Sequence, residues 1–129
     1  MIGSRGPRML RLTAQYADIW HLDGCNWPEK MIEPLDKLKG ACAEVGRDLD
    51  TLEITARVTI AYPEIGQLPW FMNTDTSLTG TVAEIAAAIQ GFEKLGVSHL
   101  MFHCGPFNQA AMAQLVKAVD LFRNRTNAI

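Results

Sequence analysis

The sequence lacks the features of a membrane, secreted or nucleic-acid-binding protein. No apolar run approaches the roughly 18 residues that a membrane-spanning helix needs, and no charged segment leads into an apolar one as in a secretory signal. With a formal net charge of -2, the chain has no basic excess to neutralise the phosphates of a nucleic acid. We therefore expect a cytoplasmic protein that binds neither nucleic acid nor membrane.

Cysteine is scarce too, and the common catalytic patterns are missing. The chain has three cysteines, an odd number, and they lie far apart in the sequence: Cys25, Cys42 and Cys104. We therefore expect free thiols in a reducing compartment. The sequence contains no Walker-type loop, and nothing in it places a Ser-His-Asp set or two carboxylates together. The catalytic residues are therefore unknown from the sequence.

What the sequence does contain is a regular alternation of helical and strand patterns within 129 residues, the size of one domain. Helical spacing of apolar residues covers 7–16, 28–46, 81–96 and the residues after Asn108, and strand-like runs cover 17–22, 52–62 and 97–104. Thr81 and Glu84 match a capping box. This order predicts an α/β fold in which helices cover a parallel sheet.

The middle strand differs from the other two. Parallel strands are normally buried on both faces, which suits the run VSHLMF, with His99 as a core histidine. In the middle strand, apolar residues alternate with Thr55, Arg57 and Thr59. This polar side must face water, a ligand or another subunit.

Arg57 lies between two threonines on that polar side. It faces an anionic ligand, pairs with a carboxylate across a dimer, or is solvated at a sheet edge. Residues 63–80 follow without any periodicity, which predicts a long loop of the kind that is usually functional or mobile.

The segment before the first helix combines glycine, proline and arginine: Gly3, Arg5, Gly6, Pro7 and Arg8. Backbone N–H groups at a helix N-terminus, approached closely through glycines, are suited to phosphate. The arginines would add charge-assisted hydrogen bonds. The alternative is a plain turn between a strand and a helix, with solvated arginines.

Stretches of the sequence resemble one known family, in the order and spacing found there. They are IGSRGPRMLRLTAQYADIW, KLKGACAEVGRDLDTLEIT and LTGTVAEIAAAIQGFEKLGVSHLMF. The family is the bacterial luciferase-like superfamily of flavin- and deazaflavin-dependent oxidoreductases and monooxygenases, built on an eight-stranded (β/α) TIM barrel. The resemblance covers most of the chain except 63–78.

In that family these stretches belong to the second half of the barrel. The resemblance therefore implies a single half-barrel domain over 1–129, lacking the first four strands. A lone half would expose two sheet edges and its polar interior. We expect a homodimer to complete the barrel, because closed symmetry pairs identical surfaces; a separate N-terminal half-barrel chain is the alternative partner.

The resemblance also implies a cofactor site. The family's loop after strand five contacts the phosphate of FMN or of a deazaflavin coenzyme, which assigns cofactor binding to Gly3, Ser4, Arg5, Gly6 and Arg8. This chain has Ser4 and then Arg5 where the family often has a second glycine and then serine. A chain that binds no cofactor is the alternative.

Histidine and cysteine recur near strand ends: His21, Cys25, His103 and Cys104. Because active sites of such barrels lie at the carboxyl ends of the strands, His21, Arg57 and His103 are candidate substrate or interior contacts, with buried packing as the alternative. The spacing matches no zinc pattern, and Cys104 faces away from His103, so we expect no metal site.

The resemblance implies a luciferase-like oxidoreductase or monooxygenase fragment that retains a cofactor-phosphate loop. In such an enzyme the cofactor supplies the chemistry, and the protein orients it and excludes water. One alternative is a non-catalytic, self-assembling half-barrel that binds a small molecule or nothing. The other is a half that complements a separate N-terminal chain.

Overall fold

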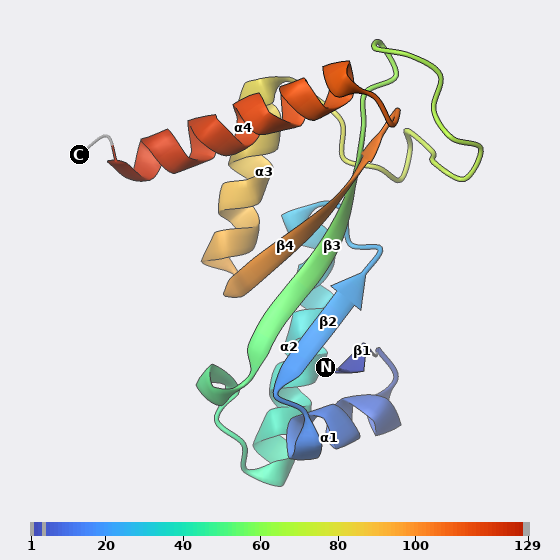
Figure 1. Ribbon diagram of the computed structural model, residues 1–129. Coiled ribbons are helices and arrows are strands. Elements are labelled where there is room, and N and C mark those ends of the chain that lie inside the picture. The colour runs from blue at the N-terminus through green and yellow to red at the C-terminus, as the bar shows by residue number, and fades with distance from the viewer. Residues whose placement is uncertain (1, 4, 128–129) are drawn as a thin grey trace.

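The computed structural model describes residues 2–3 and 5–127 of the chain (Figure 1). Its elements alternate in the predicted order: β1 (Ile2–Gly3), α1 (Pro7–Tyr16), β2 (Ile19–Asp23), α2 (Pro28–Val45), a 3₁₀ turn (Leu49–Thr51), β3 (Glu53–Ala61), α3 (Val82–Lys94), β4 (Val97–Gly105) and α4 (Gln109–Asn127). The strands form one parallel sheet in the order β1-β2-β3-β4. The prediction of an α/β half-barrel is confirmed.

The two faces of the sheet have different surroundings. One face packs against the helices and forms the core, where Trp20 and Leu22 of β2 lie with Met31 of α2 and Ile85 of α3. In Figure 1 the strands lie in front of α2, and no described helix covers β2 and β3 from the viewer's side. This open face is the one that would point into a complete barrel.

The predicted alternation along β3 is confirmed. Ile54, Val58 and Ile60 are buried on the helix side, while Arg57 is exposed and Thr59 half-buried on the other. The pairing continues each face into the neighbouring strands. On the open face Thr55 pairs in register with His21 of β2 and His99 of β4, and Asp23, Arg57 and Met101 form the next row.

The predicted burial of VSHLMF on both faces is wrong. In β4, Ser98, His99 and Met101 are exposed, and Leu100 and Phe102 are only half-buried. His99 is therefore a surface residue, not a core histidine. The physical reason is that, among the described residues, β4 pairs with β3 alone, while α4 crosses α3 and projects beyond the sheet instead of running along β4 (Figure 1).

The apolar stripes of the two outer helices are also only partly buried. On α1, Leu10 and Thr13 face the core, whereas Met9, Leu12 and Tyr16 are exposed. On α4 the buried residues are Ala111, Leu115 and Ala118, and Met112 is exposed although its spacing predicts a core position. Each of these helices packs mainly on one neighbour, α1 on α2 and α4 on α3, so its outer flank stays open.

The segment 63–80 is a loop, as predicted. Its end is tied to β3 by a bridge between Leu78 and Ile60, in which the Leu78 amide donates to the Thr59 carbonyl over 2.8 Å. The buried side chain of Asn26 adds a second tie, because it accepts from the Thr59 amide over 2.9 Å and donates to the Thr76 carbonyl. The loop therefore begins and ends against the carboxyl end of the sheet.

Among the described helices, none combines the length and the apolarity that crossing a bilayer requires.

Candidate functional site

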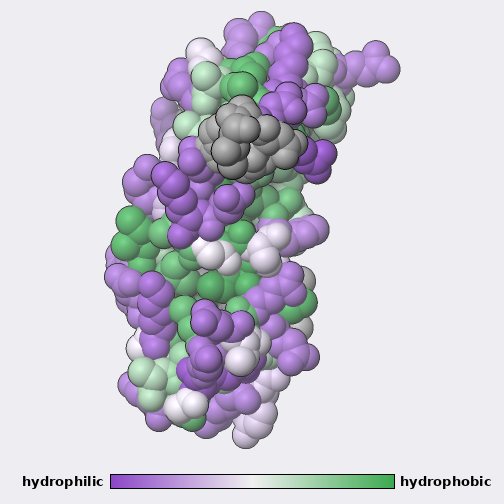
Figure 2. All heavy atoms as spheres, turned by 90° about the vertical axis from the view of Figure 1, so that its left-hand side faces the viewer, coloured by the Kyte–Doolittle hydropathy of each residue, from purple (hydrophilic) through white to green (hydrophobic). Residues whose placement is uncertain are grey.

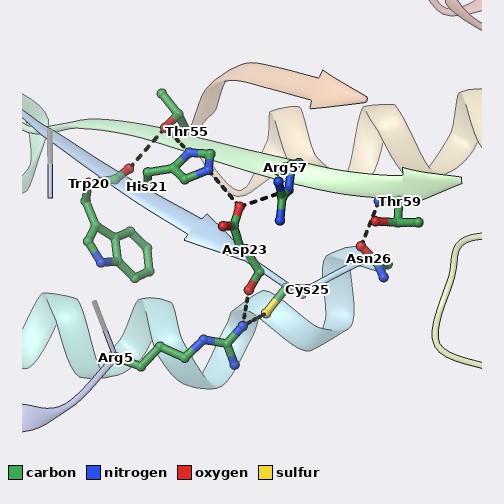
Figure 3. A network of polar contacts seen from close by, with 9 residues as sticks. All are labelled: Arg5, Trp20, His21, Asp23, Cys25, Asn26, Thr55, Arg57 and Thr59. Atoms are coloured by element: carbon green, nitrogen blue, oxygen red, sulfur yellow. Dashed lines mark hydrogen bonds and ion pairs between the residues drawn. The ribbon is translucent and has the colours of Figure 1, made fainter. Parts of the chain in front are cut away.

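A network of polar side chains lies on the open face, at the carboxyl end of β2 (Figure 3). The imidazole of His21 is held at both nitrogens, with Nδ1 2.8 Å from Thr55 Oγ1 and Nε2 2.8 Å from Asp23 Oδ1. A carboxylate only accepts hydrogen bonds, so Nε2 donates to Asp23. His21 is thus fixed in orientation by two partners on the same sheet face.

The Thr55 hydroxyl allows this network two proton arrangements. It lies 2.8 Å from His21 Nδ1 and 3.4 Å from the carbonyl oxygen of Trp20. With a neutral imidazole protonated at Nε2, the hydroxyl donates to Nδ1; with an imidazolium, it accepts from Nδ1 and donates to the Trp20 carbonyl. The Thr55 hydroxyl can therefore serve His21 Nδ1 either as a donor or as an acceptor.

Arg57 joins the same network. Its Nε lies 3.4 Å from Asp23 Oδ1, the oxygen that also accepts from His21. The two residues occupy paired positions on β3 and β2, so the carboxylate partner of Arg57 lies in its own chain, not across a dimer. Both side chains are about half exposed, at 52% and 51%, which leaves the guanidinium accessible to a ligand on the open face.

Arg5 connects the loop before α1 to the end of β2. Its Nη2 donates to the Asp23 carbonyl oxygen and lies 3.5 Å from Cys25 Sγ. Burial raises the pKa of the Cys25 thiol, with the neighbouring Arg5 charge acting in the opposite direction. Cys25 is therefore a neutral thiol that donates to the Lys30 carbonyl over 3.3 Å, and its role is structural.

The start of α1 lies beside this network. Gly6 is the N-cap residue, no side chain caps the helix, and its first turn carries no acidic residue. Arg8 is exposed in that turn. Gly3 is needed for the close approach of β1 to β2, because a Cβ there would lie 3.3 Å from the His21 carbonyl oxygen. The predicted site residue Ser4 lies outside the described residues.

A pocket of about 310 Å³ joins several of the predicted residues. It is lined by Gly3, Arg5, His21, Leu22 and Asp23. The structure therefore brings the first loop and the first histidine together, as a site at the carboxyl end of the sheet requires. Whether the loop binds a cofactor phosphate stays a prediction.

His103 and Cys104 do not join this pocket. The His103 ring contacts Phe71 and Phe107, whereas Cys104 is buried on the other side of β4, where burial raises the pKa of its thiol. Within the described residues, no group of three or more histidine, cysteine or acidic side chains lies in place to hold a metal ion.

Sequence reasoning missed two features of this region. Asp23 follows His21 by two positions, so the period of a strand already places both on one face; that signal was present in the sequence. The contacts of Phe71 and Phe107 with His103 had no such signal, because both residues lie in loops without periodicity.

Comparisons with known proteins agree with this architecture. Residues 1–64 match the model of the luciferase-like monooxygenase family. An F420-dependent secondary alcohol dehydrogenase, solved with an F420-acetone adduct, superposes with a TM-score of 0.56 at 14% identity over 78% of this chain and 41% of its own. The coenzyme F420 dependent tetrahydromethanopterin reductase from Methanopyrus kandleri superposes with a TM-score of 0.63 at 15% identity over 89% of this chain and 48% of its own.

These solved structures share the fold with this chain, which spans less than half of the length of either. No curated protein sequence matches the chain. The half-barrel topology expected from the sequence is thus confirmed.

Proposed function

We propose that this chain is one half of a barrel oxidoreductase that binds a deazaflavin coenzyme, because residues 1–64 match the model of the luciferase-like monooxygenase family. The choice of a deazaflavin over FMN follows from the two F420-dependent enzymes that share its fold. When bound, the coenzyme supplies the hydride chemistry, and the protein supplies binding, orientation and electrostatics.

The observation that carries this proposal is the pocket beside the uncapped start of α1. Its lining combines Gly3 with Arg5, His21 and Asp23, and the first turn of α1 offers backbone N–H groups and carries no acidic residue of its own. These groups fit a phosphate, which helix N-termini and arginines both attract. Arg8 is the exposed cation of that turn, so we assign it to the phosphate.

The other polar residues have different roles in the proposal. Arg5 already donates to the Asp23 carbonyl, so it holds the loop in place and contributes charge to the pocket. Arg57 faces the barrel interior, where it suits an anionic group of the coenzyme or of the substrate. Asp23 and His21 orient each other beside that interior.

The proposed barrel needs a second half, and we propose that a second copy of the chain supplies it. Both edges of the sheet, β1 and β4, have unpaired flanks. Apolar side chains stay exposed on the outer helices, Met9 and Tyr16 on α1 and Met112 and Val116 on α4. Figure 2 shows hydrophobic surface across the middle of the face formed by α3, α4 and β4.

The oligomeric state is measured directly by sedimentation equilibrium over a wide concentration range. We expect the mass of a dimer, and Tyr16→Arg should shift it toward the monomer because a charge then enters the apolar flank. A monomer at all concentrations contradicts closure by a second copy and favours a separate N-terminal half-barrel as the partner.

The coenzyme proposal is tested by fluorescence titration of the full chain with coenzyme F420 and with FMN. Arg8→Ala removes a charge-assisted hydrogen bond, so we expect affinity to fall about tenfold or more. Arg11→Ala is the matched control, because Arg11 lies one turn further along α1 and faces α2 in a separate groove.

Each result of the titration has a definite meaning. Equal losses in Arg8→Ala and Arg11→Ala would show a diffuse charge effect and contradict the phosphate site. Tighter binding of FMN than of F420 would make the cofactor a flavin. No saturable binding of either compound would leave a self-assembling half-barrel without a coenzyme.

A further inference from the structure

Aromatic rings gather at the carboxyl end of β4, outside the network drawn in Figure 3. Trp70 and Phe71 come from the loop 63–80, His103 from β4, and Phe107 from the turn that leads into α4. The ring centroids of Phe71 and His103 lie 5.6 Å apart, and those of His103 and Phe107 5.4 Å apart. None of these rings has a role in the phosphate site.

The rings form an array of offset stacks. His103 is inclined by only 19° to both Phe71 and Phe107, and the two phenyl rings are inclined by 34° to each other. In a column of stacked rings the outer two would lie about twice as far apart as neighbours, yet Phe71 and Phe107 are separated by only 6.3 Å. The three centroids therefore form a compact triangle, in which each phenyl ring stacks with an offset on the imidazole.

This array is open to solvent and held in place from behind. Phe71 is 50% exposed and Phe107 64%. The two loops that carry them meet at Gly105, where a Cβ would lie 2.3 Å from the sulfur of Met72, itself a buried side chain. The Gly105 carbonyl also accepts from the Tyr62 amide over 2.8 Å. The array is thus fixed before any ligand arrives, which lowers the entropic cost of binding.

We propose that Phe71, His103 and Phe107 form a stacking surface for the planar aromatic ring of a small-molecule ligand. Aromatic pairs favour offset stacking at centroid distances of roughly 4.5–7 Å, and the exposed rings of Phe71 and Phe107 offer this contact to a further ring. A helix or a second chain would need a groove that receives side-chain ridges. The position also fits, because His103 pairs in register with Thr59, at the carboxyl ends of strands where barrel ligands lie.

The ring has two conceivable sources with the same chemistry, the coenzyme and the substrate. The proposal does not depend on the phosphate site, so a phosphate-free probe tests it alone. Lumichrome has the flavin ring system without side chain or phosphate, and 2-naphthol represents an unrelated planar ring. Trp70 packs edge-on against Phe71 at 5.7 Å and is 95% exposed, so its emission reports on the array.

The experiment titrates the full chain with lumichrome and with 2-naphthol and follows lumichrome anisotropy together with the part of the tryptophan emission change that Trp70→Phe abolishes. Phe107→Leu keeps an apolar side chain but removes the ring, and we expect it to weaken binding roughly two- to tenfold, the range expected for one aromatic pair. Ile32→Ala is the control, because Ile32 is an exposed apolar residue of α2 outside both the array and the proposed dimer surface, and it should leave the affinity unchanged.

The source of the ring follows from a second arm with F420 and FMN. A parallel loss of coenzyme affinity in Phe107→Leu assigns the array to the coenzyme ring; a loss confined to lumichrome or 2-naphthol assigns it to the substrate. Arg8→Ala should leave lumichrome binding intact, which separates this test from the phosphate site. The proposal is overturned if neither planar probe binds saturably, if Phe107→Leu binds as well as the parent chain, or if Phe107→Leu changes only the oligomeric mass.

Discussion

The strands β3 and β4 have equal length and run side by side, yet they are buried to different extents. Each has nine residues. On the helix side, Ala56 and Val58 of β3 are completely buried, whereas their register partners Leu100 and Phe102 of β4 are only half-buried. The difference comes from position in the sheet, because β3 has a strand on each side and β4 has only one. Composition alone does not decide how much of a parallel strand is buried.

The two strands also carry different candidate binding groups. The covered strand β3 carries Thr55 and Arg57 of the polar network, and the open strand β4 carries His103 of the aromatic array. A charged or anionic group fits the first region, and a planar apolar ring fits the second. The comparison therefore predicts both how stability is distributed and where different parts of a ligand bind.

The largest effect on stability is expected when one apolar residue in each strand is replaced by alanine. Ile60→Ala removes a completely buried side chain of β3 and should lower the free energy of unfolding by about 2–5 kcal/mol. Leu100→Ala, at a half-buried position on the same face of β4, should cost about 1 kcal/mol. Urea denaturation measures both, and similar losses would mean that β4 is as well covered as β3.

The covered end of β3 should also show in the alkaline pH dependence of stability. Burial raises the pKa of Tyr62 to about 12, and the nearby Cys104 and Glu64 act in the same direction. Because the folded pKa lies above the unfolded value of about 10, stability is intact below pH 10 and falls by about 2–3 kcal/mol as pH rises through 12.

Tyr62→Phe isolates that contribution. Within the described residues, the buried Tyr62 hydroxyl has no hydrogen-bond partner, so its removal should also stabilise the chain by about 1 kcal/mol at neutral pH. Denaturant unfolding of both chains between pH 7 and 12 tests this. A variant that loses as much stability as the parent above pH 10 would contradict the assignment to Tyr62.

The helices on either side of β4 give a finer comparison. Thr81 and Glu84 form a reciprocal capping box at the start of α3, as predicted, and Asn108 accepts from the Ala111 amide over 2.9 Å at the start of α4. Thr81→Ala should cost about 1 kcal/mol. Asn108→Ala should cost about half as much in global unfolding, because α4 projects beyond the sheet and opens more readily. The reverse order in thermal melts would place α4 in the stable part of the molecule.

The smallest effect is expected on the open face of β3. Arg57 and Asp23 form a half-exposed ion pair, and such pairs contribute roughly 0–1 kcal/mol. Arg57→Ala should therefore leave the melting temperature almost unchanged, while it weakens any anionic ligand on that face. A large loss of stability would instead make Arg57 a structural residue.

Sequence patterns predicted those parts of the molecule that local physics controls. The order of elements, the alternation along β3 and the capping box at Thr81 all depend on residues close together in the chain, and all are confirmed. The grouping of Arg5 with His21 in one pocket also agrees with the expected barrel topology.

The failures have a different origin. The exposure of His99 depends on what lies beyond β4, and the aromatic contacts of Phe71 with Phe107 depend on how two distant loops meet. Neither is encoded in the periodicity of a single segment. Strand position and loop packing are tertiary properties. A sequence pattern that predicts burial correctly in a central strand therefore predicts too much burial in an edge strand.

The strand order of the sheet has one further consequence, for how the chain folds. Each strand pairs only with its neighbours in the chain, so no strand has to be inserted between two that have already formed. The pairs span one βα unit each, from Ile19 to Glu53 and from Ile54 to Val97, so the sheet can grow one unit at a time. Because β4 pairs with β3 along the full strand while β1 pairs with β2 at Ile2 and Gly3, the last two strands form the most persistent part of the sheet and the first strand opens most readily.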